Sequence, residues 1–190
     1  MKLFKNLLNV VKPHLRKTGS MMELGCGLGR WTRVFSSYVK NIEAFDYSNS
    51  FIESAKLISS KNNVTNVNFT CLDVTNINTN KFYDYVVSIA LLHYLDELQY
   101  EKCIEVIKNS LLIGGIAILR ESFGYSQRFE MHGYYSDVLN QRYDAVYRTI
   151  DEIIESFGKD FSIIENKMTL PPTDTKPETC QRVIILRKEH

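Results

Sequence analysis

The chain has 190 residues, of which 44% are hydrophobic and 24% charged, and its formal net charge is +1. This length and composition predict one globular domain with a sizeable core, and they exclude a disordered or fibrous protein. The near-neutral charge is not typical of a nucleic-acid-binding protein, although it leaves a local basic patch open. No apolar run approaches the roughly 20 residues of a membrane span. From the charge we expect no nucleic-acid partner, and from the absence of such a run we expect no membrane partner.

The cysteines give no sign of a metal site. They stand far apart in the chain, at Cys26, Cys71, Cys103 and Cys180, and no two form a CxxC pair. This spacing does not favour zinc, so we expect no metal. Buried thiols in a reducing compartment are the simpler interpretation, which predicts a cytoplasmic protein.

The first 17 residues, MKLFKNLLNVVKPHLRK, place apolar side chains on one helical face. A signal peptide is not favoured because Lys5, Asn6 and Asn9 interrupt the apolar run and no small-residue cleavage site follows. We therefore expect an N-terminal helix within 1–17 that packs on the rest of the chain. Pro13 should end or kink it.

From residue 20 onward, strand-like and helix-like segments alternate. Strands are expected at 20–24, 41–45, 67–71, 83–91 and 113–119, and helices at 30–40, 49–60 and 96–110. A further helix is expected at 149–157, followed by strands at 161–168 and 180–187. No helix fits between the last two strands, so they should pair antiparallel. We expect residues 1–190 to form one α/β domain.

The segment between the fifth strand and the last helix, residues 122–147, lacks this alternation. It holds Tyr125, Tyr134, Tyr135, Tyr143 and Tyr147, five of the chain's 11 tyrosines. Because it begins at the carboxyl edge of the predicted sheet, we interpret it as an aromatic lid inserted over a ligand site. Its rings suit an amphipathic or cationic substrate. A small helical subdomain with ordinary tyrosine packing is the alternative.

The stretch MMELGCGLGRW, residues 21–31, joins the first strand to the first helix of the alternating region with three glycines at alternate positions. Such a turn permits close approach of a ligand to the backbone. A phosphate loop is excluded, since Arg30, Trp31 and Thr32 follow where Lys-Ser/Thr is needed. A dinucleotide is disfavoured because the spacing is GxGxG rather than GxGxxG. Glu23 instead suits a ligand that carries an ammonium or sulfonium charge.

At these residues the sequence resembles a known family. ELGCGLGR is similar to motif I of the class I methyltransferases that use S-adenosylmethionine, and YDYVVSIALLHYL, residues 83–95, is similar to their motif IV. The resemblance runs from about residue 19 to residue 121 and then into the closing hairpin. It implies a doubly wound, seven-stranded, mostly parallel sheet with strand order 3-2-1-4-5-7-6, a C-terminal antiparallel hairpin and helices on both faces. It also implies S-adenosylmethionine as the cofactor and S-adenosylhomocysteine as its product.

The resemblance assigns cofactor roles by position. Asp46, at the end of the second strand, would accept hydrogen bonds from the ribose hydroxyls. Asp73, after the third strand, would lie near the adenine amino group, with Leu72 and Val74 beside the ring. The full implied set is Glu23, Gly25, Gly27, Gly29, Arg30, Trp31, Asp46, Tyr47, Asp73, Val74 and Ile89.

Each of these positions also has a structural alternative. Glycine-rich turns occur in many doubly wound proteins. Asp46 could instead cap the following helix, Asp73 could form an Asx turn, and Trp31 could belong to the core.

The reaction is read from the residues after the fourth and fifth strands. SIALLHYL stands where amino-group nucleic-acid methyltransferases have an NPPY-type tetrapeptide, so a flipped base is not the expected acceptor. The resemblance then implies methyl transfer to a nitrogen or oxygen of a small molecule. His93 is the first candidate for a general base, although relatives also carry His here for packing. Glu121 and Tyr134 are the other catalytic candidates. The expected substrate-binding residues are Arg120, Tyr135, Tyr147 and Arg148.

Three other functions stay open. The first is methylation of protein α-amino termini, the second a non-catalytic regulatory partner that binds S-adenosylmethionine, and the third a dinucleotide-dependent oxidoreductase. Intact motif glycines and Asp46 argue against an eroded regulatory partner, and the absence of a second domain argues against an oxidoreductase. The sequence predicts no oligomeric state.

Overall fold

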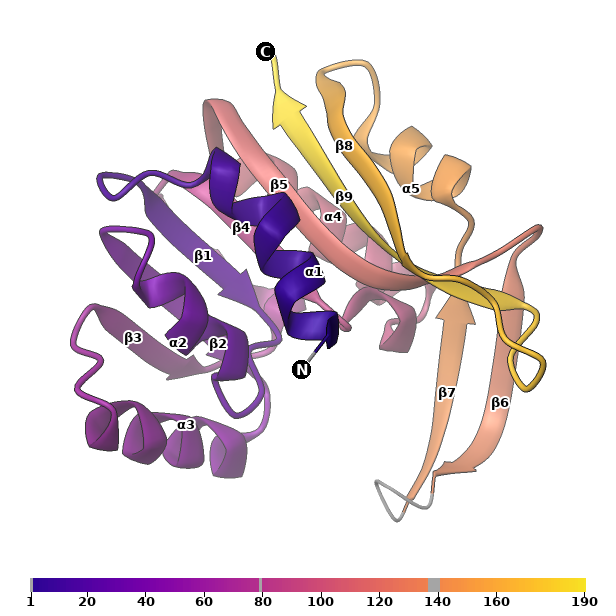
Figure 1. The fold of residues 1–190 in the computed structure, drawn as a ribbon, viewed down its shortest axis with the longest axis horizontal. Coiled ribbons are helices and arrows are strands. Elements are labelled where there is room, and N and C mark those ends of the chain that lie inside the picture. The colour runs from indigo at the N-terminus through magenta and orange to yellow at the C-terminus, as the bar shows by residue number, and fades with distance from the viewer. Residues whose placement is uncertain (1, 79, 137–140) are drawn as a thin grey trace.

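A seven-stranded sheet in the order β3-β2-β1-β4-β5-β9-β8 forms the centre of the molecule (Figure 1). The computed structural model describes residues 2–78, 80–136 and 141–190. The strands of the sheet are β1 (Ser20–Leu24), β2 (Asn41–Asp46), β3 (Val67–Cys71), β4 (Tyr83–Ile89), β5 (Leu111–Gly124), β8 (Phe161–Leu170) and β9 (Thr179–Lys188). The first five are parallel, and β9 runs antiparallel to both β5 and β8. This confirms the predicted sheet order, with β8 and β9 as its sixth and seventh strands.

Helices cover both faces of the sheet, as expected. They are α1 (Lys2–Val11), α2 (Arg30–Ser36), α3 (Asn49–Lys61), α4 (Glu97–Ser110) and α5 (Ile150–Phe157), with 3-10 turns η1 (Lys12–His14), η2 (Val74–Asn76) and η3 (Leu92–Tyr94). The N-terminal α-helix ends just before Lys12-Pro13, in line with the expected effect of proline. The helix predicted over 30–40 is shorter and ends at Ser36.

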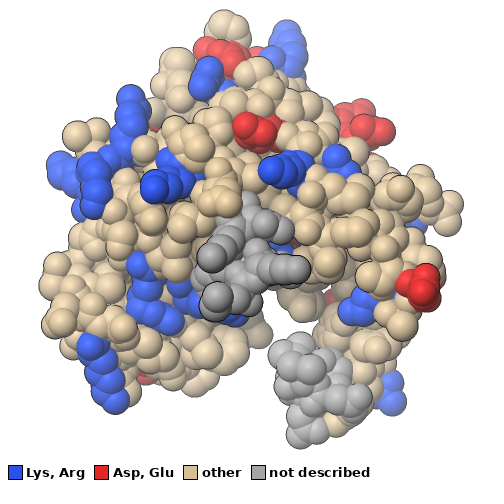
Figure 2. Space-filling model, in the orientation of Figure 1, with Lys and Arg blue, Asp and Glu red and all other residues tan. Residues whose placement is uncertain are grey.

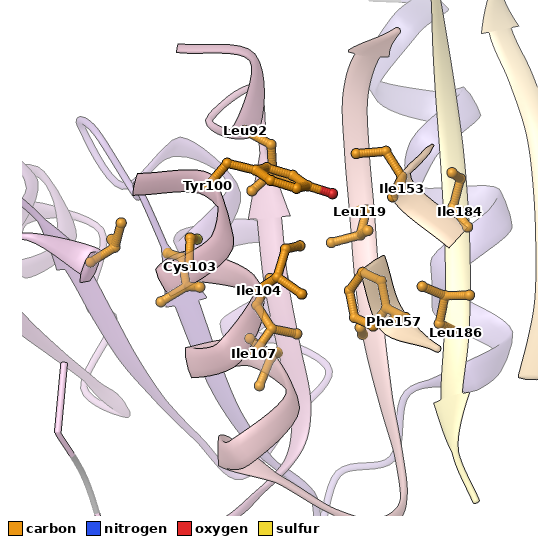
Figure 3. Packing of buried hydrophobic residues seen from close by; sticks show 14 of the residues in the cluster. Leu92, Tyr100, Cys103, Ile104, Ile107, Leu119, Ile153, Phe157, Ile184 and Leu186 are labelled. Atoms are coloured by element: carbon orange, nitrogen blue, oxygen red, sulfur yellow. The ribbon is translucent and has the colours of Figure 1, made fainter. Parts of the chain in front are cut away.

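Two apolar clusters, one on each face, hold the helices to the sheet. On one face Val11 of α1, Phe35 of α2 and Ile52 of α3 are buried against the strands. On the other face, Ile104 of α4 and Phe157 of α5 are buried in the second cluster, and Figure 3 shows the labelled side chains of these helices packed beside Leu119, Ile184 and Leu186 of the sheet. Burial of one such side chain contributes about 1.5–3 kcal/mol to the stability of the fold. These contacts therefore hold in place the sheet whose carboxyl edge carries the candidate site described below.

Strand β5 is twice as long as the predicted 113–119 segment. Strand β9 pairs antiparallel with β5, from the pair Ile116 and Arg187 to the pair Gly124 and Thr179. Strand β5 therefore continues well past the end of β4. The extension carries Arg120 and Glu121 within regular strand. It also takes residues 122–124 out of the predicted lid.

The rest of the predicted lid is a β-hairpin. Strands β6 (Phe129–Ser136) and β7 (Gln141–Tyr147) pair antiparallel as a separate two-stranded sheet with an irregularity between Met131 and Tyr134. The hairpin projects from the end of β5, away from the central sheet, and Figure 2 shows an open notch between it and the body (Figures 1 and 2). The expectation of an irregular segment is wrong, and so is the helical alternative, for the described residues of 122–147.

Basic side chains gather on the half of the molecule that carries α1 and α2 (Figure 2). Exposed members in residues 7–40 are Lys12, Arg16, Lys17, Arg30 and Lys40, and the only acidic residue in that range, Glu23, is buried. The near-neutral net charge therefore hides an uneven distribution.

In the described residues no helix is long and apolar enough to cross a bilayer. Nor do three or more His, Cys, Asp or Glu side chains come together there in a way that could hold a metal ion. Three of the cysteines are buried as expected, but Cys71 is exposed, which corrects that expectation for one thiol.

Candidate functional site

The glycine-rich loop lies between the end of β1 at Leu24 and the start of α2 at Arg30. Gly29 precedes the helix with φ +67°, and a Cβ there would lie 2.9 Å from the ring of Phe69 on β3. Glycine is therefore required for both conformation and space. Gly27 also has a positive φ, but a Cβ on it would meet no atom within 4 Å. The loop thus packs against the sheet on one side and is open on the other.

Asp46, the last residue of β2, fastens this loop. Its Oδ2 accepts the backbone N–H of Gly27 at 2.7 Å, and its Oδ1 accepts that of Ser48 at 2.9 Å. The carboxylate is buried, and each oxygen keeps a second lone pair for a further donor. The cap of α3 is Ser48, whose hydroxyl accepts from Phe51 N–H, so the helix-cap alternative for Asp46 is wrong.

Asp73 follows a residue that is hydrogen-bonded to the end of β2: the N–H of Leu72 donates to the backbone oxygen of Asp46 at 2.9 Å. Its Oδ1 accepts from both N–H and Oγ of Thr75, at 2.9 and 2.8 Å, and starts η2. The Asx-turn alternative is therefore present. The side chain is exposed, while the neighbouring Val74 is buried.

The remaining predicted cofactor residues surround the same loop less closely. Tyr47, just after Asp46, is 78% exposed, and Arg30 at the start of α2 is also exposed. Trp31 is half-buried and stacks on Phe35 with ring centroids 5.7 Å apart, in agreement with its core alternative. Ile89 is half-buried at the end of β4.

Glu23 is a buried carboxyl group directly before the glycine loop. It is 2% exposed, and its Oε2 has no hydrogen-bond partner among the described residues. Burial raises the pKa of Glu23 to about 7, against smaller opposing effects of Thr32 and Arg33. The group is therefore close to changing charge at neutral pH.

Because the pKa of Glu23 is raised, we expect the free energy of unfolding to depend on pH. Glu23→Gln should remove this dependence. Between about pH 4.5 and 7 the folded chain keeps a proton that the unfolded chain loses, so the free energy of unfolding falls as pH rises through that window. At pH 8 the variant should be more stable than the parent protein by roughly 3 kcal/mol, and at pH 4.5 it should lose this advantage.

Urea unfolding at pH 4.5 and 8 measures this difference, with Glu53→Gln on the exposed side of α3 as the control. If the free energy of unfolding falls between pH 4.5 and pH 8 as much in Glu23→Gln as in Glu53→Gln, Glu23 does not titrate in this range.

Glu121 organises the end of β4 from the neighbouring strand. Its side chain is 1% exposed. Oε1 accepts the hydroxyl of Ser88 at 2.8 Å, and both carboxylate oxygens lie within 3.1 Å of the N–H of Leu91. Oε2 lies 3.2 Å from Nδ1 of His93. Ala90, which lies between the end of β4 and Leu91, has φ +57°, a rare conformation for a residue with a Cβ. The carboxylate thus holds the turn that presents His93.

The contact with Glu121 fixes the tautomer of His93. A carboxylate only accepts, so we assign the proton to Nδ1, which leaves Nε2 as an acceptor. The ring is 7% exposed and stacks on Tyr147, with centroids 5.5 Å apart, while the Tyr94 ring lies 4.2 Å from it. In this orientation Nε2 is the ring nitrogen that could accept a proton.

The hairpin brings further tyrosines to this histidine. The ring of Tyr143 on β7 makes an edge-to-face contact with the ring of Tyr94, with centroids 5.6 Å apart. It makes another with the ring of Tyr134 on β6, with centroids 5.7 Å apart. Burial and, to a smaller extent, the nearby Tyr143 phenol raise the pKa of Tyr147. We call Tyr94, Tyr134, Tyr143 and Tyr147 the tyrosine cluster. Sequence reasoning named Tyr143 only as one of the lid tyrosines and left Tyr94 out, although Tyr94 directly follows His93 in the chain.

The structure separates two predicted substrate-binding arginines from this cluster. Arg148 is 3% exposed, donates to the carbonyl oxygens of Leu92, Leu95 and Asp96 at 3.3–3.4 Å, and lies 3.8 Å from the Tyr100 ring. Its Nη1 and Nη2 groups thus bind the start of α4, where Nη2 also pairs with Glu97 at 3.0 Å, while Nε has no hydrogen-bond partner among the described residues.

Arg120 and Tyr135 are also directed away. Arg120 precedes Glu121 on β5 and so points to the opposite face, where it donates to Gln181. Tyr135 follows Tyr134 on β6 and likewise points to the other face of the hairpin. Of the four predicted substrate residues, only Tyr147 belongs to the tyrosine cluster.

Arg128, which the sequence offered only as a residue that could bind an anionic group of the substrate, anchors the hairpin to the body. Its guanidinium donates to Glu97 of α4 at 2.7 Å, to Glu130 of β6 at 2.8 Å and to Glu152 of α5 at 3.2 Å. Three carboxylates around one guanidinium fix the base of the hairpin against both helices.

Comparison with known proteins identifies relatives of this chain. Residues 21–115 match the family model described as a methyltransferase domain. Malonyl-[acyl-carrier protein] O-methyltransferase of Bacillus cereus is 31% identical over 148 residues, 74% of this chain and 52% of the relative. Phosphoethanolamine N-methyltransferase of Triticum aestivum is 32% identical over 106 residues, 54% of this chain and 21% of the relative. The chain therefore spans about half the length of the first relative and a fifth of the second.

Solved structures share the fold. Coclaurine N-methyltransferase, bound to N-methylheliamine and S-adenosylhomocysteine, superposes with a TM-score of 0.77 at 15% identity and covers 98% of this chain and 72% of its own. The 1,6-didemethyltoxoflavin-N1-methyltransferase of Burkholderia thailandensis, with its substrate and S-adenosylhomocysteine bound, gives 0.79 at 16% identity, covering 99% of this chain and 79% of its own. At these identities the agreement concerns the fold alone.

Proposed function

The chain belongs to the methyltransferase-domain family, and on this premise we propose that it transfers the methyl group of S-adenosylmethionine to a nitrogen or oxygen atom of a small molecule. The observation that carries the proposal is the 2.7 Å hydrogen bond from Gly27 N–H to Asp46, which joins a glycine loop to a buried carboxylate at the carboxyl edge of the sheet. We take residues 1–190 as one methyltransferase domain. Its free thiols suit a reducing compartment such as the cytoplasm.

The residues present fit this cofactor. The unused lone pairs of Asp46 would accept the two ribose hydroxyls, and the open side of Gly27 leaves room for a ligand against the loop. Asp73 would face the adenine amino group, with Val74 beside the ring. When bound, the cofactor supplies an electrophilic methyl group on a positively charged sulfur.

The chain's own contribution to the reaction is positioning and proton removal. Nε2 of His93 would accept the proton that the attacking amine or hydroxyl loses. Glu121 would keep the ring oriented and stabilise the imidazolium that results. The hairpin would exclude water from this edge of the sheet and hold the acceptor in line.

Titration calorimetry with S-adenosylmethionine, S-adenosylhomocysteine and NAD, each alone, tests the proposal. We expect the first two to bind with micromolar affinity. Asp46→Ala should weaken both by at least about tenfold, the equivalent of one hydrogen bond to a charged group. Asp46→Asn, which keeps an acceptor for Gly27, separates loss of the charge from collapse of the loop. Glu53→Ala is the control, since Glu53 is exposed and pairs only with Lys56.

Binding of NAD alone would contradict the proposal and favour an oxidoreductase. The same holds if none of the three binds to a folded protein. Binding without turnover of any amine or hydroxyl acceptor would favour the non-catalytic regulatory partner.

A further inference from the structure

The tyrosine cluster has an electronegative lining. The rings of Tyr94, Tyr134 and Tyr143 meet edge to face, and the Tyr147 ring stacks on His93 beside them. Burial raises the pKa of Tyr94, and the Tyr143 phenol and the Glu121 carboxylate raise it further. The groups that act on these phenols are therefore neutral or negative. Ring faces and phenol oxygens that converge in this way attract positive charge.

The arginines of the hairpin and its ends are engaged elsewhere. Arg148 donates to carbonyl oxygens at the start of α4, Arg128 donates to carboxylates of α4, β6 and α5, and Arg142 donates to the carbonyl of Gly133 at 2.5 Å. In the described part of residues 122–148 no arginine is thus directed to the cluster. A carboxylate or phosphate would meet no guanidinium there.

We propose that the tyrosine cluster binds the methyl acceptor as a cationic amine, with the ammonium group against the faces of Tyr94 and Tyr143. The inference rests on the proposed function and narrows its acceptor to an amine nitrogen. The half-exposed Tyr94 and Tyr134 form the open side of the cluster, while the buried Tyr147 and His93 form its floor. An amine held at this floor passes one proton to Nε2 of His93 and so gains the free electron pair that it needs to be methylated.

The first test measures binding of a cation that cannot react. Tetramethylammonium, which has no N–H, is titrated into the protein with and without S-adenosylhomocysteine and followed by NMR. The matched neutral probe is tert-butanol, and the anionic probe is acetate. We expect tetramethylammonium to bind at least about tenfold more tightly than either, because only a cation gains from the ring faces.

Variants locate the site. Tyr143→Leu and Tyr94→Leu should each weaken tetramethylammonium at least about threefold, while Tyr143→Phe, which keeps the ring, should bind it nearly as the parent protein does. Tyr125→Leu is the control, since Tyr125 lies in the same segment, is 55% exposed and belongs to no ring contact of the cluster.

Equal binding of the neutral probe would overturn the inference in favour of a merely apolar surface, and preferred binding of acetate would overturn it in favour of a carboxylate acceptor. S-adenosylhomocysteine binding without tetramethylammonium binding would refute the inference and leave the proposed function standing. Loss of S-adenosylhomocysteine binding would refute the proposed function itself.

Discussion

Replacing His93 with Ala is expected to lower kcat by about 10²–10⁴-fold, the range for loss of a positioned general base. Affinity for S-adenosylhomocysteine should stay unchanged, because His93 lies within η3 rather than in the glycine loop. Single-turnover kinetics with an amine acceptor measure the chemical step, and calorimetry measures the affinity. Unchanged single-turnover rates would show that the histidine only packs against Tyr147.

Glu121→Gln distinguishes a positioning role of this carboxyl group from a purely structural one. Glutamine can still accept from Ser88 and Leu91, but it carries no charge to stabilise a protonated His93. Single-turnover kinetics should therefore show a loss of kcat of at least about tenfold, with KM and the affinity for S-adenosylhomocysteine close to those of the parent protein. Ser88→Ala, which removes one neutral donor to the same carboxylate, should leave kcat nearly unchanged. Equal losses of kcat in both variants would point to a general disturbance of the turn.

Gly124→Ala is expected to have the largest effect on stability. A Cβ at this position would lie 2.1 Å from the backbone oxygen of Gln127 and 2.8 Å from that of Tyr147, so backbone at the base of the hairpin must move. Overpacking of this kind costs about 3 kcal/mol, which lowers Tm by roughly 6–12 °C in a chain of this size. Binding of tetramethylammonium should weaken with it, since the hairpin carries Tyr143 and Tyr147.

Gly114→Ala is the matched control for that substitution. Gly114 has φ +78° with open space around it, so the change costs only the strain of about 1 kcal/mol. Calorimetric melting of both variants compares the two effects. A smaller loss in Gly124→Ala than in Gly114→Ala would mean that the base of the hairpin is loosely packed.

The sheet was predictable, and the residues that we propose for the cofactor could be selected from the sequence, because their signals are local. The GxGxG turn, the aspartates that end β2 and follow β3, and the apolar run of β4 each stand within a few residues. Two of their details were not. Ser48 caps α3 in place of Asp46, and the Asx turn of Asp73 coexists with its position near the loop.

The acceptor half could not be predicted because it depends on contacts between distant residues. Strands β6 and β7 pair mainly with each other, and the ion pairs of Arg128 reach Glu97 and Glu152, 31 and 24 residues away. Which face of the sheet an arginine side chain points to depends on the register of its strand, because successive side chains alternate between the two faces. Because β5 is extended by pairing with β9, Arg120 and Glu121 fall on opposite faces, and only the carboxylate reaches His93.

The way the hairpin joins the body also has an evolutionary consequence. The chain leaves β5 after Gly124 and returns at Arg148, and the N–H of Gly124 donates to the carbonyl of Arg148 at 3.0 Å, so the excursion is closed at its base. The glycine loop follows β1 and Asp46 ends β2, and the excursion enters neither strand. A segment of another length between Gly124 and Arg148 would therefore leave that part of the sheet unchanged. On the proposed function, such a scaffold can change its methyl acceptor independently of the residues that we propose for the methyl donor.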